Sequence, residues 1–181
     1  MKYITVFCSA RDIAEKYTKP AQEFAQLLVK NGFGLVWGGT DKGLMKIIAS
    51  TVKKEGGRLV GISIPFFQEF ARKDADEMII AGTLGERKME MMRKGEAIVA
   101  MIGGIGTLDE ITEIIELKRI NEHHKPIILL NTENFYQGLK VQLQKMKEDG
   151  FLHVPLEDLI YFADTPQEAI EYIKRKLKEK K

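Results

Sequence analysis

The sequence predicts an α/β protein: a Rossmann-like, doubly wound parallel sheet with helices on both faces. Short apolar runs alternate with longer amphipathic segments along the whole chain, which is the pattern of successive βαβ units. The run Ala97–Ile102 is apolar throughout, as is typical of a strand buried on both faces of a parallel sheet. A length of 181 residues suits one domain, and no linker divides it, so we expect residues 1–181 to form a single domain.

The individual elements follow from composition and periodicity. Strands rich in β-branched and aromatic residues are expected at 3–8, 35–37, 58–62, 97–102, 127–130 and 159–162. Helices, several of them ending at glycine, are expected at 20–31, 44–55, 84–94, 108–121, 135–148 and from 166 onward. The segment 66–82 fits neither pattern, and we expect it to be an irregular loop over the functional site.

Composition and charge exclude several classes of protein. The single cysteine, Cys8, rules out an internal disulfide and indicates a cytoplasmic protein. No segment has the pattern of a signal peptide or the length of a membrane-spanning helix. The basic run Lys174–Lys181 lacks interleaved aromatic residues, so we interpret it as a solvated helix end rather than a nucleic-acid surface. The pair His123-His124 has no further ligand residues nearby in the sequence, so no metal site is expected.

Two glycine-rich turns stand where strands are predicted to end and helices to begin. They are 38–43, Gly-Gly-Thr-Asp-Lys-Gly, and 103–107, Gly-Gly-Ile-Gly-Thr. Glycine lets a phosphate approach the backbone, and the N–H groups of the following helix are free to bind it. Glycines that serve packing alone are the alternative, but two such turns at one edge of the sheet favour a ligand site. Neither turn fits the P-loop or the dinucleotide fingerprint, so a mononucleotide is expected.

Arg87 and Glu110 each have two interpretations. Thr107-x-x-Glu110 before an apolar helix has the sequence of a capping box, with Thr107 at the N-cap and Glu110 at N3. The same glutamate, one turn after a phosphate-binding loop, is placed to steer water or face positive charge on a sugar. Arg87 is either a solvated surface residue or a charged, planar fork for a phosphate or ribose oxygen. Spacing alone does not choose between these roles.

A combination of motifs across residues 3–150 resembles the LOG family. Arg87-Lys88-x-x-Met91 is followed, after an apolar strand, by Gly103-Gly104-x-Gly106-Thr107-x-x-Glu110. The N-terminal half is similar too, with Val6-Phe-Cys-Ser9, Gly34-Leu-Val-Trp-Gly-Gly39, Gly43-Leu-Met45 and Val60-Gly-Ile62, and Lys125-Pro126 also matches. These proteins are cytokinin riboside 5′-monophosphate phosphoribohydrolases, often mislabelled as lysine decarboxylases.

The resemblance implies hydrolysis of the N-glycosidic bond of a nucleoside 5′-monophosphate, such as AMP or a cytokinin riboside monophosphate, to free base and ribose 5-phosphate. Arg87 and Glu110 would form the catalytic pair, and no cofactor is implied. The implied substrate-binding residues are Ser9, Gly38, Gly39, Gly43, Lys88, Gly103, Gly104, Ile105, Gly106 and Thr107. It also implies a homodimer or higher homo-oligomer, through the helices that carry Met91 and Ile114. Lysine decarboxylation is rejected, because it needs a pyridoxal-phosphate scaffold and a Schiff-base lysine.

The sequence departs from the family pattern at several positions. Ile102 stands where the family has proline, and Thr40 and Lys46 replace glycines near the first turn. The stretch between Ile64 and Leu84 does not follow the plant pattern. These changes leave open a function of a different class, a carrier that holds a nucleotide or phosphate-bearing cofactor without turning it over. The presence of both Arg87 and Glu110 favours the enzyme.

Overall fold

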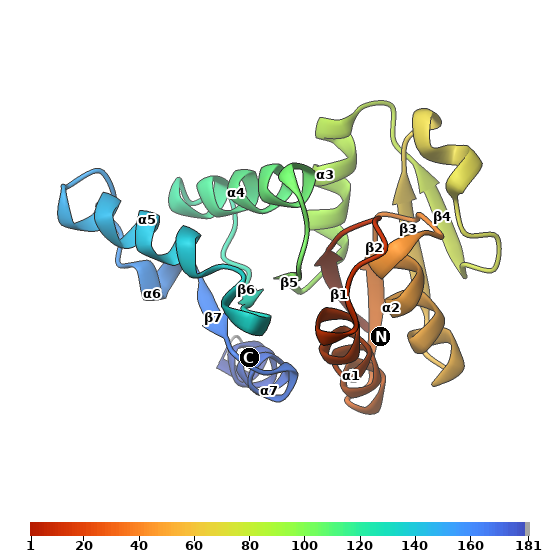
Figure 1. Ribbon diagram of the computed structural model, residues 1–181. Coiled ribbons are helices and arrows are strands. Elements are labelled where there is room, and N and C mark those ends of the chain that lie inside the picture. Colours follow the sequence, from red (N-terminus) through yellow and green to blue (C-terminus); the bar gives the residue numbers. More distant parts are fainter. Residues whose placement is uncertain (180–181) are drawn as a thin grey trace.

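A seven-stranded sheet, parallel throughout, forms the centre of the molecule in the computed structural model, which describes residues 1–179 (Figure 1). The strands are β1 (Lys2–Phe7), β2 (Phe33–Trp37), β3 (Leu59–Ser63), β4 (Glu77–Ile80), β5 (Ala97–Ala100), β6 (Ile127–Leu130) and β7 (Tyr161–Ala163). Their order is β4-β3-β2-β1-β5-β6-β7. The chain therefore builds outward from β1 to one edge and then crosses back to β5, so the strand order reverses between β1 and β5. Such a switch point opens a crevice at the carboxyl ends of the two strands.

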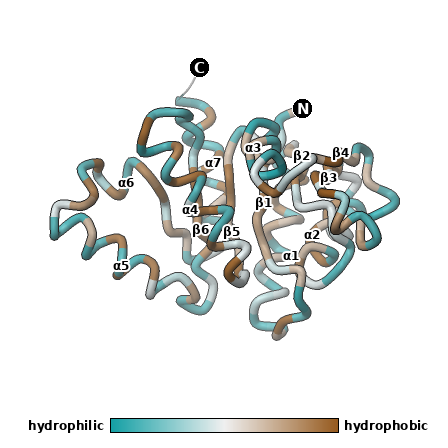
Figure 2. The backbone as a smooth tube through the Cα atoms, turned by 90° about the horizontal axis from the view of Figure 1, so that it is seen from above, coloured by the Kyte–Doolittle hydropathy of each residue, from teal (hydrophilic) through white to brown (hydrophobic). Residues whose placement is uncertain are grey.

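Helices cover both faces of the sheet, which confirms the predicted doubly wound architecture (Figures 1 and 2). One face carries α1 (Glu15–Lys30), α2 (Gly43–Lys54) and α7 (Pro166–Glu179). The other carries α3 (Leu84–Lys94), α4 (Ile105–Arg119), α5 (Gln137–Glu148) and α6 (Leu156–Leu159). Two short 3₁₀ helices, η1 (Pro65–Phe70) and η2 (Thr132–Asn134), follow β3 and β6.

Alternate residues of the central strands point their side chains into two apolar layers, one on each face of the sheet. On β1, Ile4 and Val6 point to the layer under α1, α2 and α7, which holds Phe24 and Ile48. Phe7 points to the opposite layer, where α3 and α4 bury side chains such as Met91, Ile111 and Ile114. Because side chains alternate along a strand, a sheet covered on both faces needs strands that are apolar at nearly every position. This explains the continuous apolar runs in the sequence.

The structure corrects the predicted elements in four places. Residues 77–80 of the segment expected to be irregular form an edge strand, β4, paired with β3. Helix α1 begins at Glu15, five residues before the predicted start at Pro20. Helix α4 begins at Ile105 instead of Leu108, so Thr107 lies inside it. The short α6 was not predicted, and Lys180 and Lys181 of the basic run lie outside the described residues.

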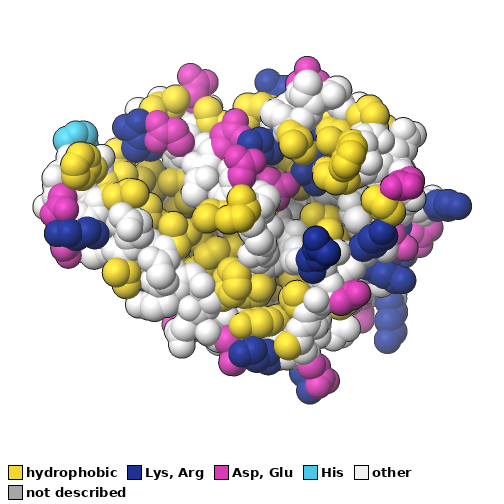
Figure 3. Space-filling model, turned by 45° about the horizontal axis from the view of Figure 1, so that its top comes forward, with side chains coloured by type: hydrophobic (Ala, Val, Ile, Leu, Met, Phe, Trp, Pro, Cys, Tyr) yellow, Lys and Arg dark blue, Asp and Glu magenta, His cyan; other side chains and the backbone are white. Residues whose placement is uncertain are grey.

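Helix α5 differs from the others because none of its residues is buried. Leu139 and Leu143 pack only partly against the core, and Met146 is 38% exposed. Figure 3 shows hydrophobic side chains gathered in a hollow over this part of the molecule, between α4 and α5. Among residues 1–179, no helix combines the length and apolar character needed to cross a bilayer.

Candidate active site

A cleft of about 560 Å³ opens at the carboxyl edge of the sheet, where α2, α3 and α4 begin. This is the switch point between β1 and β5, where ligands bind in doubly wound sheets. The lining residues come from the end of β1, the starts of these three helices, and η1: Cys8, Ser9, Ala10, Arg11, Thr40, Lys42, Met45, Phe67, Phe70, Leu84, Arg87, Lys88, Gly104, Gly106, Thr107, Asp109 and Glu110. The cleft thus brings together Ser9, the adjacent pair Arg87 and Lys88, and Glu110, which come from three separate parts of the sequence.

Arg87 lies in the first turn of α3 and reaches across the floor of the cleft. Its side chain is 6% exposed. Nε donates to the carbonyl of Ile62 at the end of β3 (2.9 Å), and Nη1 donates to Glu110 Oε1 on α4 (2.7 Å). Two of its hydrogen-bonding directions are therefore fixed by β3 and α4. The solvated surface role considered for Arg87 is wrong.

Glu110 is not the helix cap that its sequence motif suggests. Three Thr-x-x-Glu motifs occur in the chain, and two are capping boxes: Thr83 Oγ1 accepts from the Glu86 amide, while Glu86 accepts from the Gly82 amide. Thr165 and Glu168 repeat this exchange before α7. In the third motif, α4 has already begun two residues before Thr107, with Gly104 at the N-cap and no side-chain cap. Glu110 therefore lies in the second turn, and its carboxylate is available to Arg87.

The buried pair has unusual electrostatics. Burial raises the pKa of Glu110 above its ordinary value of 4.5, and the nearby Arg87 charge offsets this only in part. Burying two charges costs more than their attraction commonly returns, so such a pair is weak evidence for stability. A carboxylate with a shifted pKa in a cleft is instead typical of a functional site. Cys8, at the floor of the same cleft, is fully buried, and burial raises the pKa of its thiol.

Lys88 forms a second connection between the same two helices. Its Nζ donates to Asp109 (2.9 Å) and forms an ion pair with Glu113, both on α4. Adjacent residues of α3 thus contact adjacent residues of α4, with the Arg87–Glu110 pair inside and the Lys88–Asp109 pair outside. These carboxylates, above all through hydrogen bonds, raise the pKa of Lys88, although burial opposes this shift. Lys88 keeps its charge beside the cleft.

The second glycine-rich turn lies against the cleft with its backbone facing the open space. Gly104 and Gly106 line the cleft, and a Cβ on either would meet no atom within 4 Å. Gly103 is different, because a Cβ there would overlap the Thr107 hydroxyl. The absence of a side chain at Gly103 therefore lets Thr107 pack against the turn. Ile105 is 82% exposed and does not line the cleft. Since the first N–H groups of a helix have no intrahelical acceptor, this turn offers amide donors to an anion.

The first glycine-rich turn shapes the site from behind. A Cβ at Gly38 would overlap the Arg87 guanidinium, and one at Gly43 would overlap the backbone of Ala10 and Arg11. Gly39 has a positive φ of 74°, which side chains rarely adopt. None of these three glycines lines the cleft, although Thr40 and Lys42 of the same turn do. One amide of this turn is already in use, because the Met45 amide at the start of α2 donates to the Ser9 carbonyl (3.1 Å).

Sequence reasoning assigned no role to the residues that anchor α3. Lys125, just before β6, donates through Nζ to three carbonyls at the C-terminal end of α3: Met92 (2.7 Å), Arg93 (2.9 Å) and Gly95 (2.5 Å). Thr5 of β1 donates to the Met91 carbonyl (2.7 Å). Lys125 thereby satisfies carbonyls that a helix end leaves unpaired, while the Met91 carbonyl also accepts from the Gly95 amide (3.4 Å). The only sequence signal for Lys125 was its place in the Lys125-Pro126 match.

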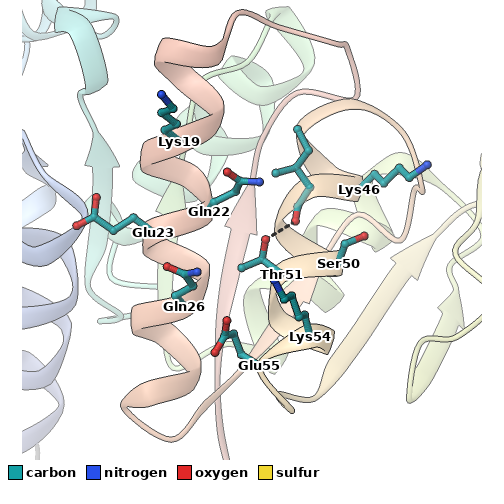
Figure 4. A pocket seen from close by; sticks show the side chains of 10 residues that line it. Lys19, Gln22, Glu23, Gln26, Lys46, Ser50, Thr51, Lys54 and Glu55 are labelled. Carbon is teal, nitrogen blue, oxygen red and sulfur yellow. Dashed lines mark hydrogen bonds between the residues drawn. The ribbon is translucent and has the colours of Figure 1, made fainter.

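A second hollow, of about 580 Å³, lies between α1 and α2 and contains none of the predicted site residues. Figure 4 shows its lining side chains, including Lys19, Glu23, Lys46 and Lys54, spread along two exposed helix faces rather than converging on one point. It lacks the buried charges of the first cleft. Within residues 1–179, no group of three or more His, Cys, Asp and Glu side chains is placed to hold a metal ion.

Comparison with known proteins gives the family. Residues 45–173 match a family model described as "Possible lysine decarboxylase". The chain is 33% identical over 174 residues to the cytokinin riboside 5′-monophosphate phosphoribohydrolase LOG5 of Arabidopsis thaliana, covering 94% of this chain and 76% of the relative. This chain belongs to the LOG family. A LOG relative of the same enzyme name from Mycobacterium tuberculosis (strain ATCC 25618 / H37Rv) is 29% identical over 170 residues, covering 92% of this chain and 90% of the relative.

The fold of this LOG family member also occurs in the solved structure of a protein with a different name. The molybdenum cofactor binding protein of Rippkaea orientalis superimposes with a TM-score of 0.76 and 24% identity, covering 97% of both chains. At that identity the likeness shows the shared Rossmann-like fold.

Proposed function

We propose that this protein is an N-glycosyl hydrolase that cleaves a nucleoside 5′-monophosphate, of the AMP or cytokinin riboside monophosphate type, into free base and ribose 5-phosphate. The observation that carries the proposal is the Glu110 carboxylate, which is held by Arg87 inside the cleft instead of capping α4. A carrier needs an anion cradle but has no use for a buried carboxylate–guanidinium pair beside it. The names of the relatives in Arabidopsis and Mycobacterium support the same substrate class.

The phosphate of the substrate fits the start of α4. The amides of Ile105, Gly106 and Thr107 are the first donors of that helix, and the N-terminal end of a helix attracts anions. Ser9 lies in the same cleft. The side chains lining the cleft include four basic residues and two acidic ones, so the cleft as a whole favours an anionic ligand (Arg11, Lys42, Arg87 and Lys88 against Asp109 and Glu110).

With the phosphate there, the ribose lies over the Arg87–Glu110 pair. As the bond between C1′ and the base nitrogen breaks, positive charge develops on the sugar, and the Glu110 carboxylate faces it. The same carboxylate takes a proton from the attacking water, whose oxygen bonds to C1′. The electron pair of the broken bond leaves with the base, which takes up a proton. Arg87 holds Glu110 in place and orients the substrate through its remaining donors.

Product analysis tests this function. We expect purified protein to release free base from at least one member of a panel that includes AMP and its N6-isopentenyl derivative, followed by chromatography. The Glu110→Gln variant keeps the shape and one hydrogen bond to Arg87 but lacks the charge, so kcat should fall by about a hundredfold or more. Tight binding by the wild type without base release across the panel would instead identify a carrier.

The pH dependence of the rate is the second readout of the same experiment. Glu110 acts as a carboxylate, and burial raises its pKa above 4.5. Protonation therefore removes activity as the pH falls, and the acid limb of the kcat profile should lie above the ordinary range for glutamate. An acid limb at or below 4.5 would contradict the assignment of Glu110 as the group that titrates.

A further inference from the structure

The hydrogen bonds of the sheet become irregular where β5 leads into the second glycine-rich turn. Phe7 of β1 pairs with Ala100 of β5, and the Met101 amide donates to the Phe7 carbonyl (2.9 Å). A regular parallel ladder would next pair the Ser9 amide with the Met101 carbonyl. In the structure the Ser9 amide donates to the Ile102 carbonyl instead (3.0 Å). The Met101 carbonyl is therefore released from the ladder just before the turn.

The released carbonyl accepts a hydrogen bond from the side chain of Tyr136, the residue before α5. The distance from Tyr136 Oη to the Met101 carbonyl oxygen is 2.6 Å, and both residues are buried. A buried tyrosine hydroxyl usually finds some partner, but here the partner is the carbonyl that the β1–β5 ladder leaves without its regular donor. Burial raises the pKa of the Tyr136 hydroxyl above its ordinary value of 10, and the nearby Cys8 and Glu110 raise it further. The hydroxyl therefore keeps its proton and remains a donor.

Tyr136 is itself fixed by its neighbours. Its amide donates to Asn131 Oδ1 (2.7 Å), and the Asn131 amide donates to the carbonyl of Ala163 on β7 (2.7 Å). The Tyr136 ring packs edge to face on Phe135, with ring centroids 5.1 Å apart and an interplanar angle of 88°. The end of β6 and the helix η2 thus set the position of the hydroxyl before any ligand arrives.

The departure from the ladder also changes the pairing of the turn itself. A regular ladder would pair the Ser9 carbonyl with the Gly103 amide, but this carbonyl accepts the Met45 amide of α2 (3.1 Å). Within residues 1–179, no backbone carbonyl accepts from the Gly103 amide. The next residue, Gly104, is the N-cap of α4. If the Met101 carbonyl returned to the Ser9 amide, the turn would be drawn toward the sheet, and the first amides of α4 would move with it.

We propose that Tyr136 is a positioning residue for the anion-binding turn, whose hydroxyl holds the Met101 carbonyl out of the sheet ladder and so fixes the amide donors at the start of α4. The inference rests on the proposed function in that it assigns the substrate phosphate to this turn. Tyr136 is not among the residues that line the cleft, so it acts through the backbone of residues 101–104 and not by touching the ligand. Donors that are held in place in advance lose little conformational entropy when an anion binds.

Binding measurements on Tyr136→Phe test the inference. Calorimetry uses inorganic phosphate, ribose 5-phosphate and adenine, none of which contains an N-glycosidic bond that the protein could cleave. The variant keeps the buried ring and removes only the hydroxyl. Its affinity for the two ligands that contain phosphate should fall by about tenfold or more, and its affinity for adenine should stay within about twofold.

Two further variants complete the experiment. Tyr17→Phe is the matched control, because the Tyr17 ring packs on Phe135 in the same aromatic cluster (centroids 6.2 Å apart) and loss of its hydroxyl should change none of the three affinities. Asn131→Ala keeps the Tyr136 hydroxyl but removes the acceptor of the Tyr136 amide. It should weaken binding of the same two ligands by about threefold, and it tests the inference if Tyr136→Phe does not fold.

The outcomes separate this inference from the proposed function. Selective loss of affinity for phosphate and ribose 5-phosphate supports the role of Tyr136 even if the wild type never releases a base, because a carrier would use the same turn. Unchanged phosphate affinity in the folded variants, or equal loss for all three ligands, overturns this role even if the wild type hydrolyses AMP. A lower unfolding temperature of Tyr136→Phe with wild-type affinities also overturns it, since the hydroxyl then serves stability alone.

Discussion

At the scale of single residues, the site depends on the absence of a side chain at Gly38 as much as on the charges of Arg87 and Glu110. The guanidinium of Arg87 occupies the space where a side chain at position 38 would begin. Arg87 in turn places Glu110, because their 2.7 Å hydrogen bond joins two different helices. A glycine predicted to bind phosphate therefore has a different role in the structure, which is to leave space for the Arg87 guanidinium.

We expect Gly38→Ala to lower kcat/KM by about a hundredfold without removing any functional group from the cleft. A methyl group there displaces the guanidinium, and misplacing a catalytic group by about 1 Å costs on that order. Steady-state kinetics on folded protein measures the effect. Gly138→Ala is the matched control, since a Cβ at that position in α5 meets no atom within 4 Å. Full activity of Gly38→Ala would show that the position of Arg87 is not critical.

At the scale of elements, much of the fold was predictable and the start of one helix was not. Strands β5 and β6 are apolar at every position, because both faces are buried, and they were predicted within two residues of their bounds. The edge strand β4 was missed, since Glu77 and Ile80 are exposed and the segment shows no buried pattern. The start of α4 was misplaced because Thr107-x-x-Glu110 has the local sequence of a cap, and only the preceding backbone turn shows that it is not one.

Local sequence was also insufficient to predict the geometry of the site. Arg87 and Glu110 were assigned as a catalytic pair through the family resemblance, while local sequence left a solvated surface role open for Arg87 and a helix-capping role open for Glu110. Their contact depends on the positions of two helices against the sheet, and local sequence does not contain this information. The anchoring of α3 by Lys125 is of the same kind, since the lysine lies 30 to 33 residues from the carbonyls that it binds.

Lys125→Met tests whether the anchored end of α3 positions Arg87. The variant keeps the length of the side chain but leaves three carbonyls without their charged donor. Loss of hydrogen bonds to a charged group should lower the free energy of unfolding by about 2 kcal/mol, measured by urea denaturation. A fall in kcat of about tenfold, at a temperature where the variant is fully folded, is the readout that a purely structural role does not predict.

Lys145→Met is the control for that measurement. The Lys145 side chain forms an exposed i,i+4 ion pair with Asp149, the residue that follows α5, and such a pair contributes about 0.5 kcal/mol or less. Its replacement should leave kcat unchanged. If Lys125→Met lowers stability but keeps the wild-type kcat, the anchor stabilises α3 without setting the position of Arg87.

At the scale of the whole molecule, the apolar hollow beside α5 is a hydrophobic surface that a single chain leaves exposed to solvent. The homo-oligomer implied by the family resemblance was assigned to the helices carrying Met91 and Ile114. Both of these side chains are completely buried within one chain, so they are not available for contact with a second. Leu108 on α4 and Met146 on α5 remain 37% and 38% exposed, and Figure 3 shows hydrophobic side chains gathered in a hollow over this part of the molecule. Exposed apolar surface of this kind is typical of an interface.

We propose that two copies of the chain pair through this surface, and light scattering after size exclusion tests the proposal. The wild type should have a mass of about 41 kDa, twice the 20.6 kDa of one chain. Met146→Glu places a charge in the hollow and should shift the protein toward the monomer, because burying an unpaired charge at an interface is unfavourable. Val141→Glu, 58% exposed on the opposite side of α5, introduces the same charge and should leave the dimer intact. A monomeric wild type, or equal dissociation by both variants, would exclude this surface as the dimer contact.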